Sequence, residues 1–193
     1  MYELFFHAIN ERVELNASER EIIKSYLKPK KLRKKQYLLQ EGDVCNAIAF
    51  VEKGALREYS VDEKGNEHII QFALEGWIIS DLNSFMTGVP AIYNIEALED
   101  AELVLISKQA QDEIFKKVPK FETYTRLLLT GAYIAMQRRL TSVISMSLED
   151  RYNNFTSDYP HITQRVPQHM IASYMGLKPE TLSRIRKKIA TGK

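Results

Sequence analysis

The first two-thirds of the chain alternate short apolar segments with glycines at a nearly constant interval. The segments AIAFVEK, ALREYSV and HIIQFAL are largely apolar and bounded by turn residues, as β-strands are. Between the last two, DEKGNE predicts a β-hairpin, because glycine adopts the positive φ that tight turns need. Five of the eight glycines recur every 11 or 12 residues: Gly42, Gly54, Gly65, Gly76 and Gly88. This spacing predicts an antiparallel barrel or jelly roll rather than a parallel sheet.

Helical periodicity appears before about residue 28 and after about residue 108, and one long helix is predicted from about Pro119 to about Met146. Two apolar stripes follow this helix. One contains Leu129, Ala132, Tyr133, Met136, Leu140, Val143 and Ile144, and the other contains Tyr124, Leu127, Leu128, Gly131, Ile134 and Ala135. One stripe is enough to pack a helix on its own domain, so the second predicts a homodimer through this helix. The alternative is a helix buried within one chain.

Two shorter amphipathic patterns meet at Gly176, near the end of the chain. They predict one helix from about Gln168 to Met175 and another from Pro179 to about Ile189. Their apolar positions would share a small core: Ile171, Ala172, Met175, Leu177, Leu182 and Ile185. Gly176 permits a left-handed turn, and Pro179 fits a first helical turn, where its missing N–H costs nothing. The pattern predicts a helix-turn-helix, whose second helix enters the major groove of DNA.

The net charge of +2 conceals a basic C-terminal segment. Residues 164–193 contain seven basic residues and one acid, a balance of +6, whereas residues 1–163 contain 20 basic and 24 acidic residues, a balance of −4. A segment of this charge favours binding to a polyanion such as nucleic acid. The alternative is a basic tail that only keeps the protein in solution.

Composition and missing motifs narrow the class of protein. A hydrophobic fraction of 45% with 27% charged residues is typical of a soluble globular chain. No apolar run approaches the roughly 18 residues that a membrane span needs, so no membrane partner is expected. The start of the chain does not resemble a signal peptide, and a cytoplasmic location is expected. A single cysteine, Cys45, excludes internal disulfides and metal sites built on several cysteines. No catalytic motif is found, and an enzyme is not expected.

These features resemble the Crp–Fnr superfamily of bacterial transcription regulators over nearly the whole sequence. EGD, AFVEKGALREY, the hairpin and EGWIISDL resemble its cyclic-nucleotide-binding jelly roll, and LKPETLSRIRKK resembles its recognition helix. The resemblance implies an α+β fold with an effector jelly roll at residues 1–117, a dimerisation helix at 118–146 and a helix-turn-helix domain at 147–193. It implies a homodimer that binds palindromic double-stranded DNA at promoters, responds to a signal in the jelly roll and has RNA polymerase as a partner. The chain stops at Lys193, so the terminal β-hairpin wing of many relatives is expected to be missing.

The second helix of the helix-turn-helix carries the main DNA contacts that the resemblance implies. Family members commonly have Arg-Glu-Thr-Val-x-Arg there, and this chain has PETLSR, so Pro179 replaces an arginine and cannot donate. By this correspondence Glu180 accepts from a cytosine and Arg184 holds a guanine. Phosphate contacts are expected from Gln168, Lys178 and Thr181, while Ser183 and Lys187 share the exposed face with Glu180 and Arg184.

Two alternatives to DNA reading stay open at this point. Glu180 and Arg184 lie four residues apart, so they would also be able to form an intrahelical ion pair. A separate alternative is a regulatory module that acts through protein contacts, with a helix-turn-helix that no longer binds DNA. The balance of +6 and the presence of Arg184 argue against this alternative.

The effector site departs from the family pattern. The segment GWIISDL resembles the family's phosphate-binding segment, but Ser80-Asp81 stands where Gly-Glu is usual, and no arginine follows between Val89 and Ala97. A buried phosphate would lack a cation, so poor binding of cyclic AMP is expected. The candidate pocket residues are Ser80, Asp81, Leu82 and Tyr93. The interior either holds an unidentified small molecule or is filled by side chains such as Trp77, Phe85 and Tyr93. No iron–sulfur cluster, haem or other metal is expected, since Cys45 is alone and the four histidines are scattered.

Overall fold

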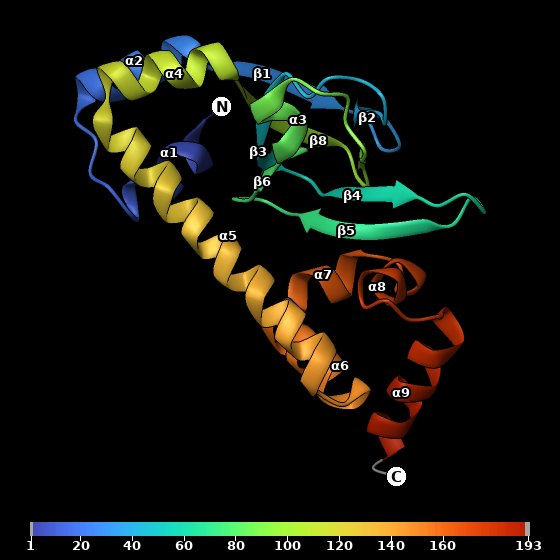
Figure 1. Cartoon of the computed structure of the whole chain (residues 1–193). Helices are drawn as coiled ribbons and strands as arrows, with labels where there is room; N and C mark the ends of the chain where they lie inside the picture. Colours follow the sequence, from blue (N-terminus) through green and yellow to red (C-terminus); the bar gives the residue numbers. More distant parts are fainter. Residues whose placement is uncertain (1, 192–193) are drawn as a thin grey trace. The chain divides into compact units, whose positions relative to one another are not determined.

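The computed structural model describes residues 2–191, and Figure 1 shows the course of the chain. Its helices are α1 (Glu3–Asn10), α2 (Ala17–Tyr26), α3 (Leu82–Thr87), α4 (Lys108–Lys117), α5 (Pro119–Ser145), α6 (Leu148–Asp158), α7 (Pro160–Arg165), α8 (Gln168–Tyr174) and α9 (Pro179–Thr191). Its strands are β1 (Lys28–Leu32), β2 (Tyr37–Leu39), β3 (Ala47–Lys53), β4 (Leu56–Val61), β5 (Glu67–Ala73), β6 (Ile78–Ile79), β7 (Asn94–Ala97) and β8 (Ala101–Ser107). Contacts divide the chain into two compact units. Unit 1 contains Met1–Ser60 and Gln71–Leu129, and unit 2 contains Val61–Ile70 and Thr130–Lys193.

Unit 1 is built on two four-stranded antiparallel sheets, with strand orders β1-β8-β3-β6 and β2-β7-β4-β5. The central strand β8 pairs with β1 on one side and β3 on the other, so Leu103 lies opposite both Lys30 and Val51. Apolar residues of both sheets, among them Ala49, Leu56, Ile79, Ile95 and Leu103, form one buried cluster. Strand neighbours from opposite ends of the domain are the mark of a jelly roll. The predicted fold is confirmed.

The turn between β3 and β4 shows why the glycine spacing carries structural information. Gly54 has a φ of 95°, and a Cβ at this position would lie 2.6 Å from the backbone oxygen of Asp100. Asp100 lies in the turn between β7 and β8, and the nearby Leu98 N–H donates to the Ala55 carbonyl at 2.8 Å. The two turns are therefore packed backbone against backbone, which only glycine permits.

A second core of unit 1 joins its helices to the first sheet. Its buried members include Phe5, Ile9, Ile23, Phe50, Ile114, Phe121 and Tyr124. Helix α2 begins with a capping box in which Asn16 and Glu19 exchange side-chain-to-backbone hydrogen bonds. The Glu19 carboxylate also pairs with Lys120 at 3.0 Å, which fastens the first turn of α5 to α2.

Unit 2 has a small core of its own, formed by helices α6 to α9. Its buried members are Phe155, Ile162, Val166, Ile171, Ala172, Met175, Leu182 and Ile185. Ser147 caps the start of α6, since its hydroxyl accepts from the Asp150 N–H, and Lys188 of α9 pairs with Glu149 of α6 at 2.8 Å. Five of the six residues predicted for the helix-turn-helix core are buried, whereas Leu177, in the turn between α8 and α9, is only half-buried.

None of the described helices combines the length and the apolarity that a membrane span requires. The division of the chain at residues 117 and 146 stays a prediction. The contact-based units instead divide α5 after Leu129, and they place the outer end of the β4–β5 hairpin with the C-terminal helices.

Candidate functional site

The turn between α8 and α9 fixes the angle at which α9 leaves α8. Gly176 has a φ of 69°, its N–H donates to the Ser173 carbonyl, and the Leu177 N–H donates to the Ala172 carbonyl. This pair of bonds is a Schellman motif, which satisfies carbonyls that a helix end leaves unpaired. Helix α9 then begins at Pro179, as the sequence predicts.

The side of α9 opposite its core is exposed and carries most of the residues expected to contact DNA. Glu180, Ser183, Arg184 and Lys187 are exposed, and Thr181 is half-buried. The Arg184 guanidinium makes one long hydrogen bond, 3.5 Å from Nη2 to Thr181 Oγ1. Within residues 2–191, Arg184 and Glu180 form no ion pair with each other. The alternative of an intrahelical pair is therefore not the arrangement observed, and both charged ends are open to a partner.

The two expected phosphate contacts outside α9 differ in their surroundings. Lys178 is exposed in the turn just before α9. Gln168 is half-buried at the start of α8, and its side-chain oxygen is sealed from solvent without a hydrogen-bond partner. A contact from Gln168 to phosphate would therefore come from its amide nitrogen, which is a donor.

Two arginines that the sequence analysis did not single out hold the C-terminal end of α8. Arg139 donates to the carbonyls of Tyr174 and Ile70, both at 2.7 Å, and its guanidinium lies 3.9 Å from the centre of the Tyr174 ring. Arg151 donates to the Met175 carbonyl at 2.6 Å. Burial, together with the nearby Arg139 charge, lowers the pKa of Arg151. A cation at the C-terminal end of a helix interacts favourably with the helix dipole and donates to carbonyls that the helix leaves unpaired.

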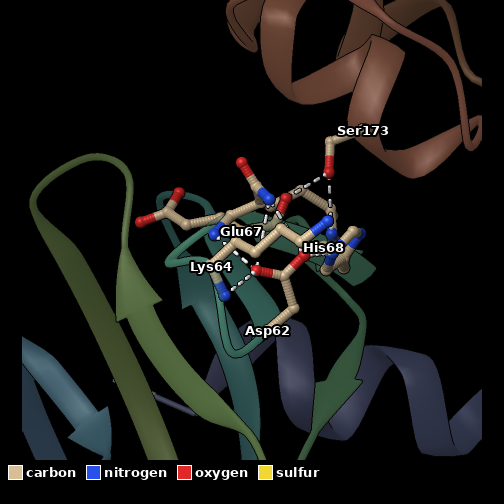
Figure 2. Close-up of polar contacts among 7 residues, drawn as sticks. Asp62, Lys64, Glu67, His68 and Ser173 are labelled. Atoms are coloured by element: carbon tan, nitrogen blue, oxygen red, sulfur yellow. Dashed lines mark hydrogen bonds and ion pairs between the residues drawn. The ribbon is translucent and has the colours of Figure 1, made fainter.

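The outer end of the β4–β5 hairpin contacts α8 through one serine. The Ser173 hydroxyl donates to the Glu67 carbonyl at 2.8 Å and accepts from the Ile69 N–H at 3.0 Å, as Figure 2 shows. The hairpin turn is closed by Asp62, which accepts from the backbone of Lys64 and contacts His68 at 3.0 Å. Hydrogen bonds from Asn66 and His68 hold the pKa of Asp62 well below its usual range. Ser173 thus acts as a bridge between strand β5 and the helix that supports α9.

Helix α5 exposes most of both predicted apolar stripes. Exposed members are Leu127, Leu129, Gly131, Ala132, Tyr133, Ile134, Ala135, Met136, Leu140, Val143 and Ile144. Tyr124 is a correction, because it is only 2% exposed and packs with Phe121 in the core of unit 1. Burial there raises the pKa of Tyr124 to about 12. Leu128 also packs partly against that core. The alternative of a helix buried within one chain does not hold from Leu129 onward.

The candidate effector residues do not all lie in the interior of the barrel. Asp81 is buried and caps α3, with Oδ1 accepting from the Ser84 N–H at 2.9 Å and Oδ2 from the Ile92 N–H at 3.1 Å. Ser80 and Tyr93 are half-buried, whereas Leu82 is 46% exposed. Of the side chains proposed to fill the interior, Phe85 is buried in the core between the sheets, but Trp77 is exposed.

Two neighbouring residues of β4, which the sequence analysis did not assign to a site, are also buried. Arg57 pairs with Glu96 at 2.6 Å and lies over the ring of Tyr59. Glu58, on the opposite face of the strand, has no hydrogen-bond or ion-pair partner among the described residues. Burial, and after it the charge of Asp81, raises the pKa of Glu58 to about 8. The sequence alone would have allowed Glu58 to be singled out, because strand alternation in ALREYSV places this acid on the same inward face as Leu56.

Known proteins resemble this chain in sequence over most of its length. Residues 29–118 match the family model of the cyclic nucleotide-binding domain. The chain is 26% identical over 185 residues to the anaerobic regulatory protein of Haemophilus influenzae, covering 89% of this chain and 70% of that protein. It is 24% identical over 167 residues to the transcriptional activator protein Anr of Pseudomonas aeruginosa, covering 80% of this chain and 67% of that protein.

Solved structures agree on the fold. A Crp/Fnr-family transcriptional regulator from Eubacterium rectale superposes with a TM-score of 0.69 at 20% identity, covering 92% of this chain and 85% of that one. Because that identity is low, the likeness speaks for the fold alone. The family model and the curated relatives confirm the resemblance seen in the sequence: residues 29–118 match a cyclic nucleotide-binding domain, and the homologues are transcription regulators of the Crp–Fnr type.

Proposed function

We propose that this chain regulates transcription as a homodimer that presents two copies of α9 to successive major grooves of a two-fold DNA site. The observation that carries the proposal is the exposed Glu180 and Arg184 on a helix whose start and supporting turn are rigidly hydrogen-bonded. In helix-turn-helix dimers the recognition helices lie about 34 Å apart, one turn of DNA. The cytoplasm and RNA polymerase are the location and the further partner that follow from this role.

Each side chain of the interface has one proposed task. Arg184 holds a guanine through two donors and Glu180 accepts from a cytosine amino group, which is how these residue types read base edges. Lys178, Thr181, Lys187 and the amide nitrogen of Gln168 contact phosphates, and Ser183 faces either a base or a phosphate. Phosphate contacts position the helix without reading the sequence, so these side chains set affinity more than specificity.

The second copy of the chain would cover the exposed side of α5. The predicted interface residues Leu127, Ile134, Gly131 and Ala135 are all exposed, with the small pair one helical turn apart. Small residues let two helix backbones approach closely, and the flanking apolar side chains then leave water together. Tyr124 takes no part, because it already packs within unit 1.

A dimer should be visible by sedimentation at micromolar concentration. We expect Ile134→Glu to convert it to a monomer, because a carboxylate would enter an apolar interface without a partner. Val89→Glu makes the same chemical change at an exposed residue far along the chain from α5, and should leave the dimer intact. A monomeric wild-type chain would contradict the dimer proposal.

Cyclic AMP is not the proposed signal. A buried phosphate needs a cation, but Arg57 is already paired with Glu96, and Lys64 is exposed at the hairpin turn. The candidate pocket residue Asp81 carries an acidic group, which would repel the anion instead. A calorimetric titration should therefore give no micromolar constant for cyclic AMP.

The proposed DNA interface is tested by comparing the affinity of the chain for DNA fragments that it selects with its affinity for scrambled DNA. Fragments are selected from a random library with the wild-type chain, and fluorescence anisotropy then compares selected with scrambled DNA. Arg184→Ala should lower affinity for selected DNA about 10- to 100-fold, since a bidentate base contact contributes about 1–3 kcal/mol. Affinity for scrambled DNA should change much less. Arg33→Ala, an exposed arginine in the turn before β2, is the matched control.

The salt dependence of the same titrations separates the proposed function from its rival. Log affinity should fall linearly with log salt, by about 0.9 per phosphate contacted. If Arg184→Ala kept the full preference for selected DNA, the assignment of base contacts to α9 would be wrong. If the wild-type chain bound no DNA even at low salt, a module acting through protein contacts would be the better description.

A further inference from the structure

Glu58 lies inside the barrel of unit 1 without a partner. It shares a face of β4 with Leu56 and lies opposite Ile95 of β7, and both of these residues belong to the buried core between the sheets. The residue is only 4% exposed, and no described residue gives its carboxyl group a hydrogen bond or an ion pair. A buried carboxyl group without a hydrogen bond is costly, so its presence calls for a reason.

The groups around Glu58 are already occupied or are acidic themselves. Asp81 uses both carboxylate oxygens on backbone N–H groups of Ser84 and Ile92. The Ser84 hydroxyl accepts from the Cys45 N–H and donates to the Val89 carbonyl. Tyr93 and Cys45 both feel the charges of Glu58 and Asp81, which raise the pKa of each after the larger effect of burial. Titratable groups near Glu58 are thus acids or weak acids.

The cation next along the strand is turned away from this group. Arg57 precedes Glu58, so its side chain leaves the opposite face of β4, where it pairs with Glu96. Among the described residues, the side-chain oxygens that are sealed from solvent without a hydrogen bond belong to Tyr124 and Gln168. The Glu58 carboxyl group is therefore without a hydrogen bond, although it is not completely sealed from solvent.

We propose that the barrel of unit 1 binds a small molecule with a protonated amine, which donates hydrogen bonds to Glu58 and lies between it and Asp81. The proposal rests on the proposed function, in which this barrel receives the signal, and it names the chemical class of that signal. An ammonium group supplies the donors that Glu58 lacks, and its single positive charge balances the negative charge that Glu58 gains when it ionises. Since Asp81 caps α3 and binds the Ile92 N–H, the amine would act directly on α3 and the segment that follows it.

Binding should release a proton from Glu58. With a pKa of about 8, the carboxyl group is mostly protonated at pH 7, and it must ionise to pair with the ammonium group, which keeps its own protons. The proton passes to the buffer, so up to one proton appears per amine bound below about pH 8. Asp81, Tyr93 and Cys45 are the other titratable groups that face this position.

The test uses the whole chain and three probes, which are methylamine, putrescine and tyramine, each titrated by calorimetry at pH 7 in phosphate and in HEPES. At least one amine should bind and raise the melting temperature, with a binding heat that differs between the buffers as proton release requires. Butane-1,4-diol, which matches putrescine in length but has no charge, should bind at least tenfold more weakly. Glu58→Gln keeps the size of the side chain and should weaken amine binding at least tenfold. Glu63→Gln, the same change at an exposed position, should not.

Two results would overturn the proposal. One is that none of the three amines binds, and the other is that Glu58→Gln binds them as well as the wild-type chain does. The heat difference between buffers is measured on the wild-type chain, so it decides the matter even if the variant fails to fold. DNA binding by the same preparations is measured separately by anisotropy. DNA binding without amine binding rejects only the amine, whereas amine binding without DNA binding rejects only the DNA-binding role.

Discussion

Unit 1 and unit 2 place their charged side chains in opposite ways. In unit 1 the notable ionisable side chains are inside, where Arg57 pairs with Glu96, and burial with the charge of Asp81 raises the pKa of Glu58. In unit 2 the partly buried Arg139 and Arg151 bind backbone carbonyls, while Arg184 points into solvent. From this difference we infer that the buried ionisable groups affect the stability of unit 1 and the chemistry of its interior. The exposed charges of α9 are instead available to a large anionic partner. The two kinds of charge should therefore be separable by mutation.

The largest effect is expected from breaking the buried pair of unit 1. Arg57→Ala leaves Glu96 buried without its cation, and removing one partner of a buried pair costs about 3–5 kcal/mol. Lys31→Ala removes the cation of the exposed pair with Glu102, whose side chains are 2.8 Å apart, and should cost far less, because solvent screens this pair. Urea unfolding measures both free energies. If both variants lost the same unfolding free energy, the proposed difference between buried and exposed charges would be wrong.

The next effect is a dependence of stability on pH that comes from Glu58. Its pKa is about 8 in the folded chain against 4.5 as its ordinary value, so folding binds a proton between these pH values. The stabilisation from this group is complete below about pH 4.5 and is lost at about 1.4 kcal/mol per pH unit as the pH rises towards 8.

Glu58→Gln removes this slope, because an amide does not titrate. The difference in unfolding free energy between the variant and the wild-type chain should therefore shift by about 2 kcal/mol in favour of the variant between pH 5.5 and 7.5. Other titrating groups cancel in that difference. A constant difference across this interval would show that Glu58 is not held in its neutral form.

The smallest effect is expected at the neutral contact of unit 2. Ser173→Ala removes two hydrogen bonds to the hairpin and should destabilise unit 2 by about 1 kcal/mol. It should also speed hydrogen exchange of the Ile69 amide, which loses its acceptor. Ser157→Ala, at an exposed position of α6, is the control for a serine with no such contact. An Ile69 amide that exchanged at the wild-type rate would mean that the serine bridge does not form in solution.

The elements that the sequence predicted well are those that depend on local rules. The β4–β5 hairpin follows from DEKGNE, and the turn before α9 follows from Gly176 and Pro179, because φ requirements act over a few residues. The core of the helix-turn-helix follows from apolar spacing along two short helices. These inferences needed no knowledge of which distant segments meet.

The contacts that sequence analysis missed join residues far apart in the chain. Arg139 reaches Ile70 across 69 positions, and Ser173 reaches Ile69 across 104. Nothing near either residue distinguishes it from an ordinary surface arginine or serine. Tyr124 was misplaced for the same reason, since its stripe on α5 is apolar throughout, and only the position of the N-terminal helices decides which part is covered. Arg184 shows the reverse case, in which the spacing within one helix was enough to predict exposure.

The contact between Gly54 and Asp100 has a consequence for anyone who redesigns this protein. The β3–β4 and β7–β8 turns pack directly against each other, so an insertion or a label in one turn would displace the other. A Cβ added at Gly65, in the turn of the β4–β5 hairpin, would meet no atom within 4 Å, so an inserted peptide tag would meet no neighbouring backbone there, although the φ of 81° disfavours replacing the glycine itself. Insertions should therefore be made in the β4–β5 turn, and the β3–β4 and β7–β8 turns should be left unchanged.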